Sequence, residues 1–364
     1  MRKTGFIVLL ASLLVGLLGT VTVQAGGGLA VTDSSVEIDF PMRLNFSLTA
    51  ESDVDITDIR LQYRVDRMGH ARVISEVFIE FAPAPAVEAG WTWDMRKTGG
   101  LPPGSRVDYW WTVENAAGDR IETSPSRLRI EDSRYAWQSL TDGLLTLYWY
   151  EGDTAFAREI INTARQVLAW LAETTGARLK NPINLYIYAS AEDLQGAMIF
   201  PQEWTGGVAF TRYSTIAIGI APDRLEWGRR AMAHEITHLV THQMVFNPYN
   251  DLPTWLEEGL AMYAEGPLYP VFADLLAAAA AEDSLISVRS LSSPFSAYAE
   301  ESALAYAQSY SIIDFLISSY GQESMLELLN TFSRGSGYDE ALMAVYSLDM
   351  DGLNVLWRQH IRQP

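Results

Sequence analysis

The sequence predicts a multidomain protein, in which an N-terminal antiparallel β-sandwich is followed by an α+β domain that is mostly helical toward the C terminus. Three observations support this fold class. The chain has 364 residues, enough for two domains of roughly 150 residues each. Apolar residues recur with a period of two between about residues 29 and 131, and with a helical period beyond about residue 135. Hydrophobic residues make up 48% and charged residues 20% of the chain, a balance typical of packed domains rather than of disorder.

The first 25 residues have the layout of a secretory signal peptide. Arg2 and Lys3 precede an apolar run over residues 6–23, and Val23-Gln24-Ala25 forms a small-x-small cleavage site. We therefore predict a signal peptide over residues 1–25 and a secreted or extracytoplasmic protein. An uncleaved N-terminal membrane anchor is the alternative, because the apolar run is just long enough to cross a bilayer.

Residues 29–131 predict the β-sandwich, with six or seven short strands. The expected strands and hairpin are Val36–Thr49 (interrupted at Pro41), Ile59–Val65, Val73–Phe81, Val107–Val113 and a turn at Asn115–Asp119 leading into Ile121–Thr123. This layout resembles immunoglobulin-like and fibronectin type III-like modules, without a specific motif. Four tryptophans could form a carbohydrate-stacking face, but we expect about half of them in the core and half on the surface: Trp91, Trp93, Trp110 and Trp111.

Residues 140–364 predict the second domain. A helix with apolar residues from Phe156 to Leu171 is followed by strands at Ile183–Tyr188 and Thr215–Ile220. Helices then dominate, and we expect them at about Glu226–Val245, Thr254–Glu265, Tyr269–Glu282, Ser302–Tyr320, Glu323–Ser333 and Tyr338–Tyr346. Because strands and helices do not alternate along the chain, an α+β fold is favoured over a doubly wound one.

Charge and residue counts exclude several kinds of function. The formal net charge is −19, so no nucleic-acid partner is expected, since phosphate binding needs a basic face. The chain has no cysteine, which excludes disulfides, thiolate metal sites and a cysteine nucleophile. There are only five histidines, and three of them fall within nine residues: His234, His238 and His242.

The segment His234-Glu235-Ile236-Thr237-His238 matches the H-E-x-x-H pattern. Residues four apart lie on one face of a helix, so both imidazoles can bind one Zn²⁺ ion. Glu235, next to the first histidine, can take a proton from a metal-bound water. His242 is expected to be a neighbour of the site or a packing residue, since another turn along the helix is usually too far to bind the metal.

A third ligand is expected 20 residues after the second histidine, at Glu258. That distance allows one helix to end and an antiparallel helix to return. A carboxylate there would complete a His₂Glu site with an open fourth position, which is typical of catalytic zinc. Glu257 is the competing ligand, but we expect it to close a capping box with Thr254 as the N-cap of the helix.

At these residues the sequence resembles the gluzincin zinc metallopeptidases, specifically the peptidase MA-like group. The run Trp255-Leu-Glu-Glu-Gly-Leu-Ala after the histidine motif carries the resemblance. It implies a zincin-type, thermolysin-like domain with zinc ligands His234, His238 and Glu258. It also implies Glu235 as general base, and an edge strand, expected at Thr215–Ile220, that holds extended substrate by β-addition. The glycine-x-methionine-glutamate-asparagine motif of gluzincin aminopeptidases is missing, so free N-terminus specificity is not favoured.

Catalysis also needs a donor for the tetrahedral oxyanion. With two histidines assigned to the metal and the others placed elsewhere, a tyrosine is expected in this role. The run Tyr306-Ala-Gln-Ser-Tyr310 resembles the tyrosine-bearing helix of peptidase MA-like proteins. We favour Tyr306, with Tyr310 and Tyr263 as alternatives. Carboxylates that could support the zinc histidines are Asp251, Glu257 and Glu265.

The leading hypothesis is a secreted zinc-dependent metallopeptidase acting on a peptide or protein substrate. Two alternatives stay open: a non-catalytic surface or binding protein with a structural zinc domain, and a gluzincin-like amidase acting on non-peptide amides. An intact Glu235 favours catalysis, because a structural site needs no base beside its ligand. For the sandwich, the sequence leaves open whether it orients the catalytic domain or attaches it to the cell surface, and the oligomeric state is not predicted.

Overall fold

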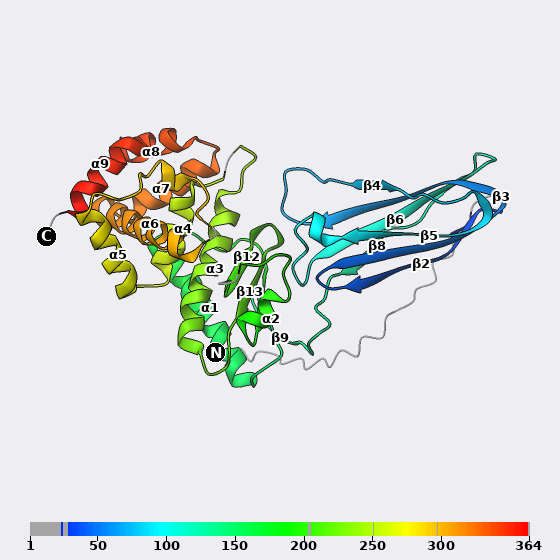
Figure 1. Cartoon of the computed structure of the whole chain (residues 1–364), viewed down its shortest axis with the longest axis horizontal. Helices are drawn as coiled ribbons and strands as arrows, with labels where there is room; N and C mark the ends of the chain where they lie inside the picture. Colours follow the sequence, from blue (N-terminus) through cyan, green and yellow to red (C-terminus); the bar gives the residue numbers. More distant parts are fainter. Residues whose placement is uncertain (1–22, 25–27, 203–204, 250, 297, 363–364) are drawn as a thin grey trace, which may run out of the picture. The chain divides into compact units, whose positions relative to one another are not determined.

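The computed structural model describes residues 23–24, 28–202, 205–249, 251–296 and 298–362 (Figure 1). The chain divides into two compact units, Met1–Gln138 with Gln195–Pro201, and Ser139–Leu194 with Gln202–Pro364. Apart from Val23 and Gln24, the predicted signal peptide over residues 1–25 lies outside the described residues. Within the described part of the chain, no helix combines the length and the apolar character needed to cross a membrane.

The first unit is an antiparallel β-structure. Its strands are β1 (Val23–Gln24), β2 (Ala30–Asp39), β3 (Arg43–Asp66), β4 (Ser75–Phe78), β5 (Ala84–Asp94), β6 (Arg106–Asn115), β7 (Arg120–Glu122) and β8 (Ser126–Arg129). Hydrogen bonds connect all eight into one sheet, with the path β1-β2-β3-β6-β7 and with β4, β5 and β8 on branches. The sequence predicts a sandwich of short strands here. The structure instead connects the strands into one sheet, because the long strand β3 pairs with several of them.

Strand β3 is 24 residues long and replaces two of the expected strands. Its first half pairs with β2 and β5, and its second half pairs with β4 and β6. The register shifts between Glu51 and Ile56 on the β5 side. Residues 53–55 between the halves are exposed, so periodicity along the sequence stops there although the backbone stays extended. The expected strand Val36–Thr49 is in fact the end of β2, a turn and the start of β3.

The core of this unit comes from alternating residues of its strands. On β3, Leu44, Phe46 and Leu48 are buried on the face that a period of two predicts. Strand β5 was not expected, because prolines and small residues mask its alternation. Two of the four tryptophans are buried and two are partly exposed: Trp93 and Trp111, and Trp91 and Trp110, respectively.

The second unit contains a five-stranded mixed sheet with the order β12-β13-β11-β10-β9. The strands are β9 (Gln138–Asp142), β10 (Leu145–Trp149), β11 (Ile183–Tyr188), β12 (Gly207–Phe210) and β13 (Thr215–Gly219). Strands β10, β11 and β13 run parallel, and β12 is antiparallel to β13. Helix α1 (Thr154–Thr174) joins β10 to β11. Strands and helices therefore alternate from β10 through α1, β11 and α2 (Ala191–Gln195) to β12, contrary to the expected lack of alternation, because the sequence predicts neither β10 nor α2.

Helices follow the sheet and form most of the unit. They are α2 (Ala191–Gln195), between β11 and β12, and α3 (Leu225–Val245), α4 (Thr254–Ala264), α5 (Pro270–Ala281), α6 (Ala299–Tyr320), α7 (Gln322–Ser333), α8 (Tyr338–Tyr346) and α9 (Met350–Ile361), with short 3₁₀ turns η2 (Thr211–Tyr213) and η3 (Ser290–Ser292). Helix α9 was not predicted. Asp349, in a segment that superficially looks like a calcium loop, caps this helix by accepting a hydrogen bond from the Gly352 amide.

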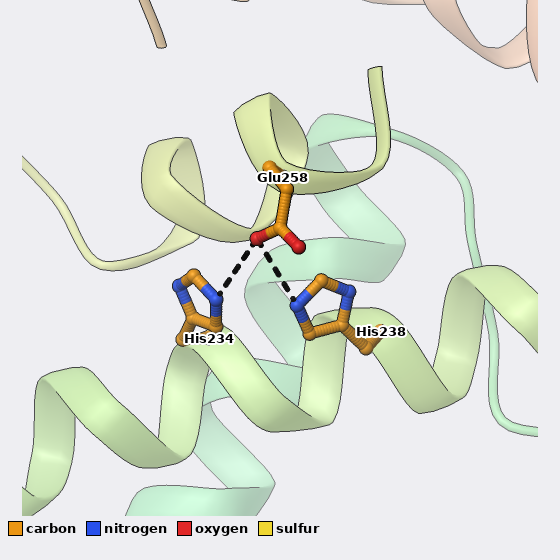
Figure 2. Close-up of side chains that lie close together, drawn as sticks. All are labelled: His234, His238 and Glu258. Atoms are coloured by element: carbon orange, nitrogen blue, oxygen red, sulfur yellow. Dashed lines mark ion pairs between the residues drawn. The ribbon is translucent and has the colours of Figure 1, made fainter. Parts of the chain in front are cut away.

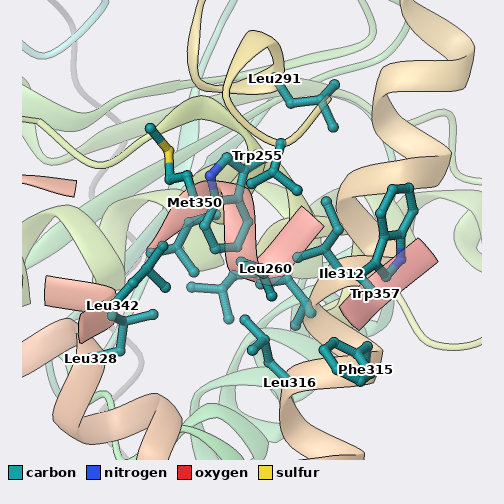
Figure 3. Packing of buried hydrophobic residues seen from close by; sticks show 14 of the residues in the cluster. Trp255, Leu260, Leu291, Ile312, Phe315, Leu316, Leu328, Leu342, Met350 and Trp357 are labelled. Carbon is teal, nitrogen blue, oxygen red and sulfur yellow. The ribbon is translucent and has the colours of Figure 1, made fainter. Parts of the chain in front are cut away.

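Two cores hold the helices. Helix α3 packs its buried residues, including Ile236 and Leu239, in one core with residues of α1 and of the sheet strands. On the other side, α4 and the later helices share a second core around Trp255, Leu260 and Trp357 (Figure 3). Helix α3 thus lies between the sheet and helix α4, which positions the two histidines of α3 opposite α4.

Candidate metal centre

His234 and His238 lie one turn apart on α3, with ring centroids 4.8 Å from each other. Both rings point toward Glu258 on α4 (Figure 2). The Nε2 atoms of His234 and His238 lie 3.4 and 3.6 Å, respectively, from Oε2 of Glu258. One ligand atom from each of the three residues lies within 4.8 Å of the other two. Helical spacing on α3 and the packing of α4 against it therefore bring three donor atoms to one point.

The donor set fits a zinc ion. Four tetrahedral ligands at 2.0–2.1 Å from a metal are about 3.3 Å apart, close to the separations of Glu258 Oε2 from the two nitrogens. A direct charge-assisted hydrogen bond would be shorter, about 2.7–2.9 Å. Oε2 of Glu258 is also buried and accepts no hydrogen bond from the described residues. Two imidazoles and one carboxylate match the donors that Zn²⁺ prefers.

The sequence prediction for Glu257 requires a correction. The N-cap of α4 is Pro253, not Thr254, and no side-chain hydrogen bond caps the helix. Thr254 instead donates to the carbonyl of Ser292. Glu257 is therefore not used in a capping box, and its Oε1 lies 3.5 Å from Nδ1 of His238. Without a capping box to close, the Glu257 side chain lies toward the outer nitrogen of this histidine.

A second carboxylate supports the other histidine. Oε1 of Glu265 lies 2.8 Å from Nδ1 of His234, and its Oε2 lies 3.5 Å from Nε of Arg230. Arg230 also donates to the carbonyl of Pro267 and stacks over Tyr269 at 3.6 Å from the ring centroid. Sequence reasoning named Glu265 among three candidates without choosing it. Arg230 was missed, although it precedes His234 by one helical turn and so shares its face.

Burial and mutual contact shift the pKa values of these groups. Burial alone would lower the pKa of His234, but Glu258 and Glu265 beside it raise it to about 9. Burial alone would also lower the pKa of His238, but Glu258, Glu257 and Glu235 together raise it. Burial alone would raise the pKa of Glu258, yet the two imidazoles hold it well below its usual value. Glu258 is therefore a carboxylate, as a metal ligand must be.

Glu235 lies on α3 beside the edge of the sheet. A Cβ atom at Gly207, the first residue of β12, would lie 2.9 Å from Oε1 of Glu235. A Cβ there would require the Glu235 side chain to shift, so glycine at this position leaves room for the carboxylate beside the strand. Burial raises the pKa of Glu235, and the two histidines oppose that shift. Glu235 is not one of the three converging donors.

The expected substrate-binding strand also requires a correction. Thr215–Ile220, predicted as the edge strand, corresponds to β13, which lies between β11 and β12. The edge is β12, which pairs with β13 through Gly207–Phe210. Strand β12 has only four residues, all half-buried, and begins at a glycine. Such a short segment shows no recognisable period along the sequence.

Among the candidate tyrosines, Tyr306 on α6 has an environment distinct from the other two. Burial raises its pKa, and the negative charges of Glu258 and Glu235 add to this effect. Tyr310 and Tyr263 are influenced instead by Asp314, and their rings contact each other. Among the three candidates, Tyr306 is thus the tyrosine whose hydroxyl is affected by the charges of both Glu235 and Glu258.

His242 does not join the three donors. It lines a cavity of about 440 Å³ next to the site, together with Glu257. Its Nε2 is buried and has no hydrogen-bond partner in the described part of the chain. Burial lowers the pKa of His242, so its ring is neutral at pH 7.

Comparison with known proteins gives one family match. Residues 163–363, more than half of the chain, match the family described as the peptidase MA superfamily. No curated protein matches the sequence.

Solved structures give low similarity scores. Aminopeptidase A of Legionella pneumophila is 13% identical, with a TM-score of 0.41 over 92% of this chain and 50% of its own. Catalytically inactive OgpA of Akkermansia muciniphila, in complex with an O-glycopeptide substrate, is 9% identical with a TM-score of 0.22, over 31% and 32% of the two chains. A β-1,3-glucan-binding domain of carbohydrate-binding module family 56 is 18% identical with a TM-score of 0.18, over 26% of this chain and 95% of its own. At these TM-scores the similarities define neither the fold nor the activity of this chain.

Proposed function

The chain belongs to the peptidase MA superfamily, and from this membership we propose that it is a zinc-dependent metallopeptidase of the gluzincin type. The ligands are His234, His238 and Glu258. One observation carries the proposal: three donor atoms converge beside a half-buried carboxylate, Glu235, that is not one of them. A structural zinc site has no use for such a group, whereas hydrolysis needs a base next to the metal.

A zinc ion bound there would polarise a carbonyl group and lower the pKa of a bound water toward about 7. Glu235 accepts the proton of the attacking water and passes it to the leaving nitrogen. Its raised pKa suits this exchange, because a general base works best when its pKa approaches the working pH. Glu265 contacts the outer nitrogen of His234 at 2.8 Å, and Glu257 lies 3.5 Å from that of His238, so both carboxylates favour the ring orientation in which Nε2 is directed at Glu258.

Substrate orientation follows from strand β12. This strand is one edge of the sheet, and its first residue, Gly207, lies beside the Glu235 side chain. An extended peptide paired with β12 passes directly beside the general base, as β-addition requires. Tyr306 donates a hydrogen bond to the oxyanion, since its hydroxyl lies in the field of both Glu235 and Glu258 and remains protonated.

The N-terminal signal pattern supports secretion, and we propose an extracytoplasmic site of action, with an uncleaved anchor as the alternative. Two other functions compete with peptide hydrolysis. A structural zinc domain in a binding protein leaves Glu235 unexplained. An amidase acting on non-peptide amides would use the same residues, and a substrate library that contains both peptide and cell-wall amides distinguishes it.

The test is the variant Glu235→Gln, which keeps the shape of the side chain but cannot accept a proton. We expect it to keep one zinc ion per chain by elemental analysis and to lose about 10²–10⁴-fold in cleavage of a peptide pool. Glu173→Gln, at an exposed glutamate of α1, is the matched control and should leave cleavage unchanged. Equal activity of Glu235→Gln and the wild type would refute the catalytic assignment.

A further inference from the structure

The cavity beside the metal centre has its own set of polar groups. It measures about 440 Å³ and is formed by the end of α3, the start of α4, the turns at η2 and η3, and the start of α8. Its lining includes few large apolar side chains and these charged or titratable residues: Arg212, His242, Asp251, Glu257 and Tyr338. Such a lining suits a polar or charged ligand group.

The cavity lies next to the groups proposed for catalysis, and Glu257 connects the two. Glu257 lines it and lies 3.5 Å from Nδ1 of His238. His242 follows His238 by one turn of α3. On the other wall, Arg212 follows the last residue of β12 by two positions. A four-residue strand spans about 13 Å, so a peptide on β12 runs from Glu235 at Gly207 toward this cavity.

The charges in the cavity are unbalanced. Asp251 and Glu257 contribute two negative charges, Arg212 contributes one positive charge, and His242 is neutral because burial lowers its pKa. In the described part of the chain, neither Asp251 nor Arg212 forms an ion pair within 4.0 Å, so their charges are not cancelled by direct contact. Burial raises the pKa of Tyr338, and the negative charges of Asp251 and Glu257 raise it further. Both carboxylates therefore act on the Tyr338 hydroxyl.

We propose that this cavity is a substrate subsite that binds a positively charged group, a guanidinium or an ammonium, between Asp251 and Glu257. The inference rests on the proposed function, because a substrate must lie along β12 to reach the cavity. Tyr338 offers its hydroxyl oxygen as a further acceptor. Arg212, which lines the cavity near the end of β12, repels a bound cation and so limits how strongly the cavity prefers a cationic group over a neutral one.

Binding to zinc-loaded Glu235→Gln tests this without turnover. Three small amide probes vary the presence and the position of a positive charge: N-acetyl-leucinamide (neutral), leucinamide (α-ammonium) and N-acetyl-argininamide (guanidinium). We expect at least one cationic probe to bind about tenfold more tightly than the neutral one. Preference for N-acetyl-argininamide assigns the subsite to a basic side chain, and preference for leucinamide assigns it to the α-amine of the substrate.

Two further substitutions should change this preference in opposite directions. Asp251→Asn in the same background should reduce it about tenfold, and Arg212→Gln should increase it. Asp274→Asn, at an exposed aspartate of α5, makes the same charge change away from the cavity and should have no effect. Glu257 is left intact because it also contacts His238.

The outcomes separate this inference from the proposed function. Equal binding of all three probes, or Asp251→Asn and Arg212→Gln shifting binding in the same direction, overturns the subsite even if the wild type is an active zinc peptidase. If cation binding follows the predicted pattern while the wild type cleaves no amide, the subsite stands as a binding site and the catalytic proposal fails.

Discussion

Oε1 of Glu265 lies 2.8 Å from Nδ1 of His234, the ring nitrogen opposite the one that faces Glu258. The carboxylate fixes the tautomer and orientation of this imidazole, leaving its Nε2 free to bind a metal. Arg230 in turn forms an ion pair with the other oxygen of Glu265, at 3.5 Å. A chain of contacts thus leads from a cation on the surface of α3 to the proposed zinc ligand.

Replacing Glu265 by Gln should weaken zinc binding by about 10–100-fold, the usual effect of losing a carboxylate behind a metal-binding histidine. Chelator competition measures this affinity directly. The matched comparison is Glu257→Gln, which should have a smaller effect because its contact with His238 is longer, at 3.5 Å. Unchanged affinity in Glu265→Gln would contradict the role assigned to this carboxylate.

Tyr306→Phe should lower kcat by about 10²–10³-fold, as loss of one oxyanion donor does, with little change in KM. The hydroxyl is proposed to act only when negative charge develops, so substrate binding should be retained. Tyr310→Phe is the control on the same helix, since Tyr310 is influenced by Asp314 rather than by Glu235 and Glu258. Equal turnover of Tyr306→Phe and the wild type would remove Tyr306 from the mechanism.

Local spacing along the chain was enough to propose the donor set. His234 and His238 share a helix face at any register of that helix, so their proximity follows from the period alone. The helices that form the second core could also be predicted, since apolar residues recur along them at a regular helical spacing. Five of the predicted helices after residue 225 begin and end within one or two residues of α3, α4, α5, α7 and α8.

Features that depend on the pairing of strands distant in sequence, or on the exact residue at which a helix begins, could not be predicted. The edge strand β12 becomes recognisable only through its pairing with β13. The sequence is compatible with Thr254 either as the N-cap or as the first helical residue of α4. Glu257 closes a capping box only in the first case, and in the structure it lies toward His238 instead. Strand β3 continues through the exposed residues 53–55 because both of its halves have partners elsewhere in the chain.

Gly259→Ala should destabilise the second unit by about 1–3 kcal/mol, as overpacking does. A Cβ at Gly259 would lie 2.5 Å from the carbonyl oxygen of Ser309 on α6. Because the obstacle is backbone, α4 and α6 would have to separate. The gain in helix propensity, about 1 kcal/mol, does not offset this cost.

Urea unfolding of the full chain measures the effect of Gly259→Ala, with Gly352→Ala on α9 as the control. There the nearest atom is a side-chain oxygen at 3.2 Å, so the control should change stability by less. A wild-type midpoint for Gly259→Ala would show that the helices can adjust. Since Gly259 follows Glu258 and Ser309 lies one turn after Tyr306, the same substitution should also lower kcat.

Stability of the first unit should fall in acid because of Asp108 on β6. Hydrogen bonds from Arg127 and Arg64 outweigh burial and lower the pKa of Asp108 from its usual 3.8 to about 2. A group whose pKa is lower in the folded state stabilises the fold above its unfolded pKa and loses that contribution as pH falls through the folded value. The loss should therefore occur between about pH 4 and pH 2.

The contribution of Asp108 should be about 1–2 kcal/mol, less than the full shift implies, because solvent screens the partly exposed arginines. Asp108→Asn should unfold more readily than the wild type at pH 7, and the difference should shrink as pH falls toward 2. Asp39→Asn is the control, since Asp39 pairs with Arg43 only at 3.9 Å and both are exposed. A difference between Asp108→Asn and the wild type that stays constant down to pH 2 would mean that Asp108 acts through packing rather than through its charge.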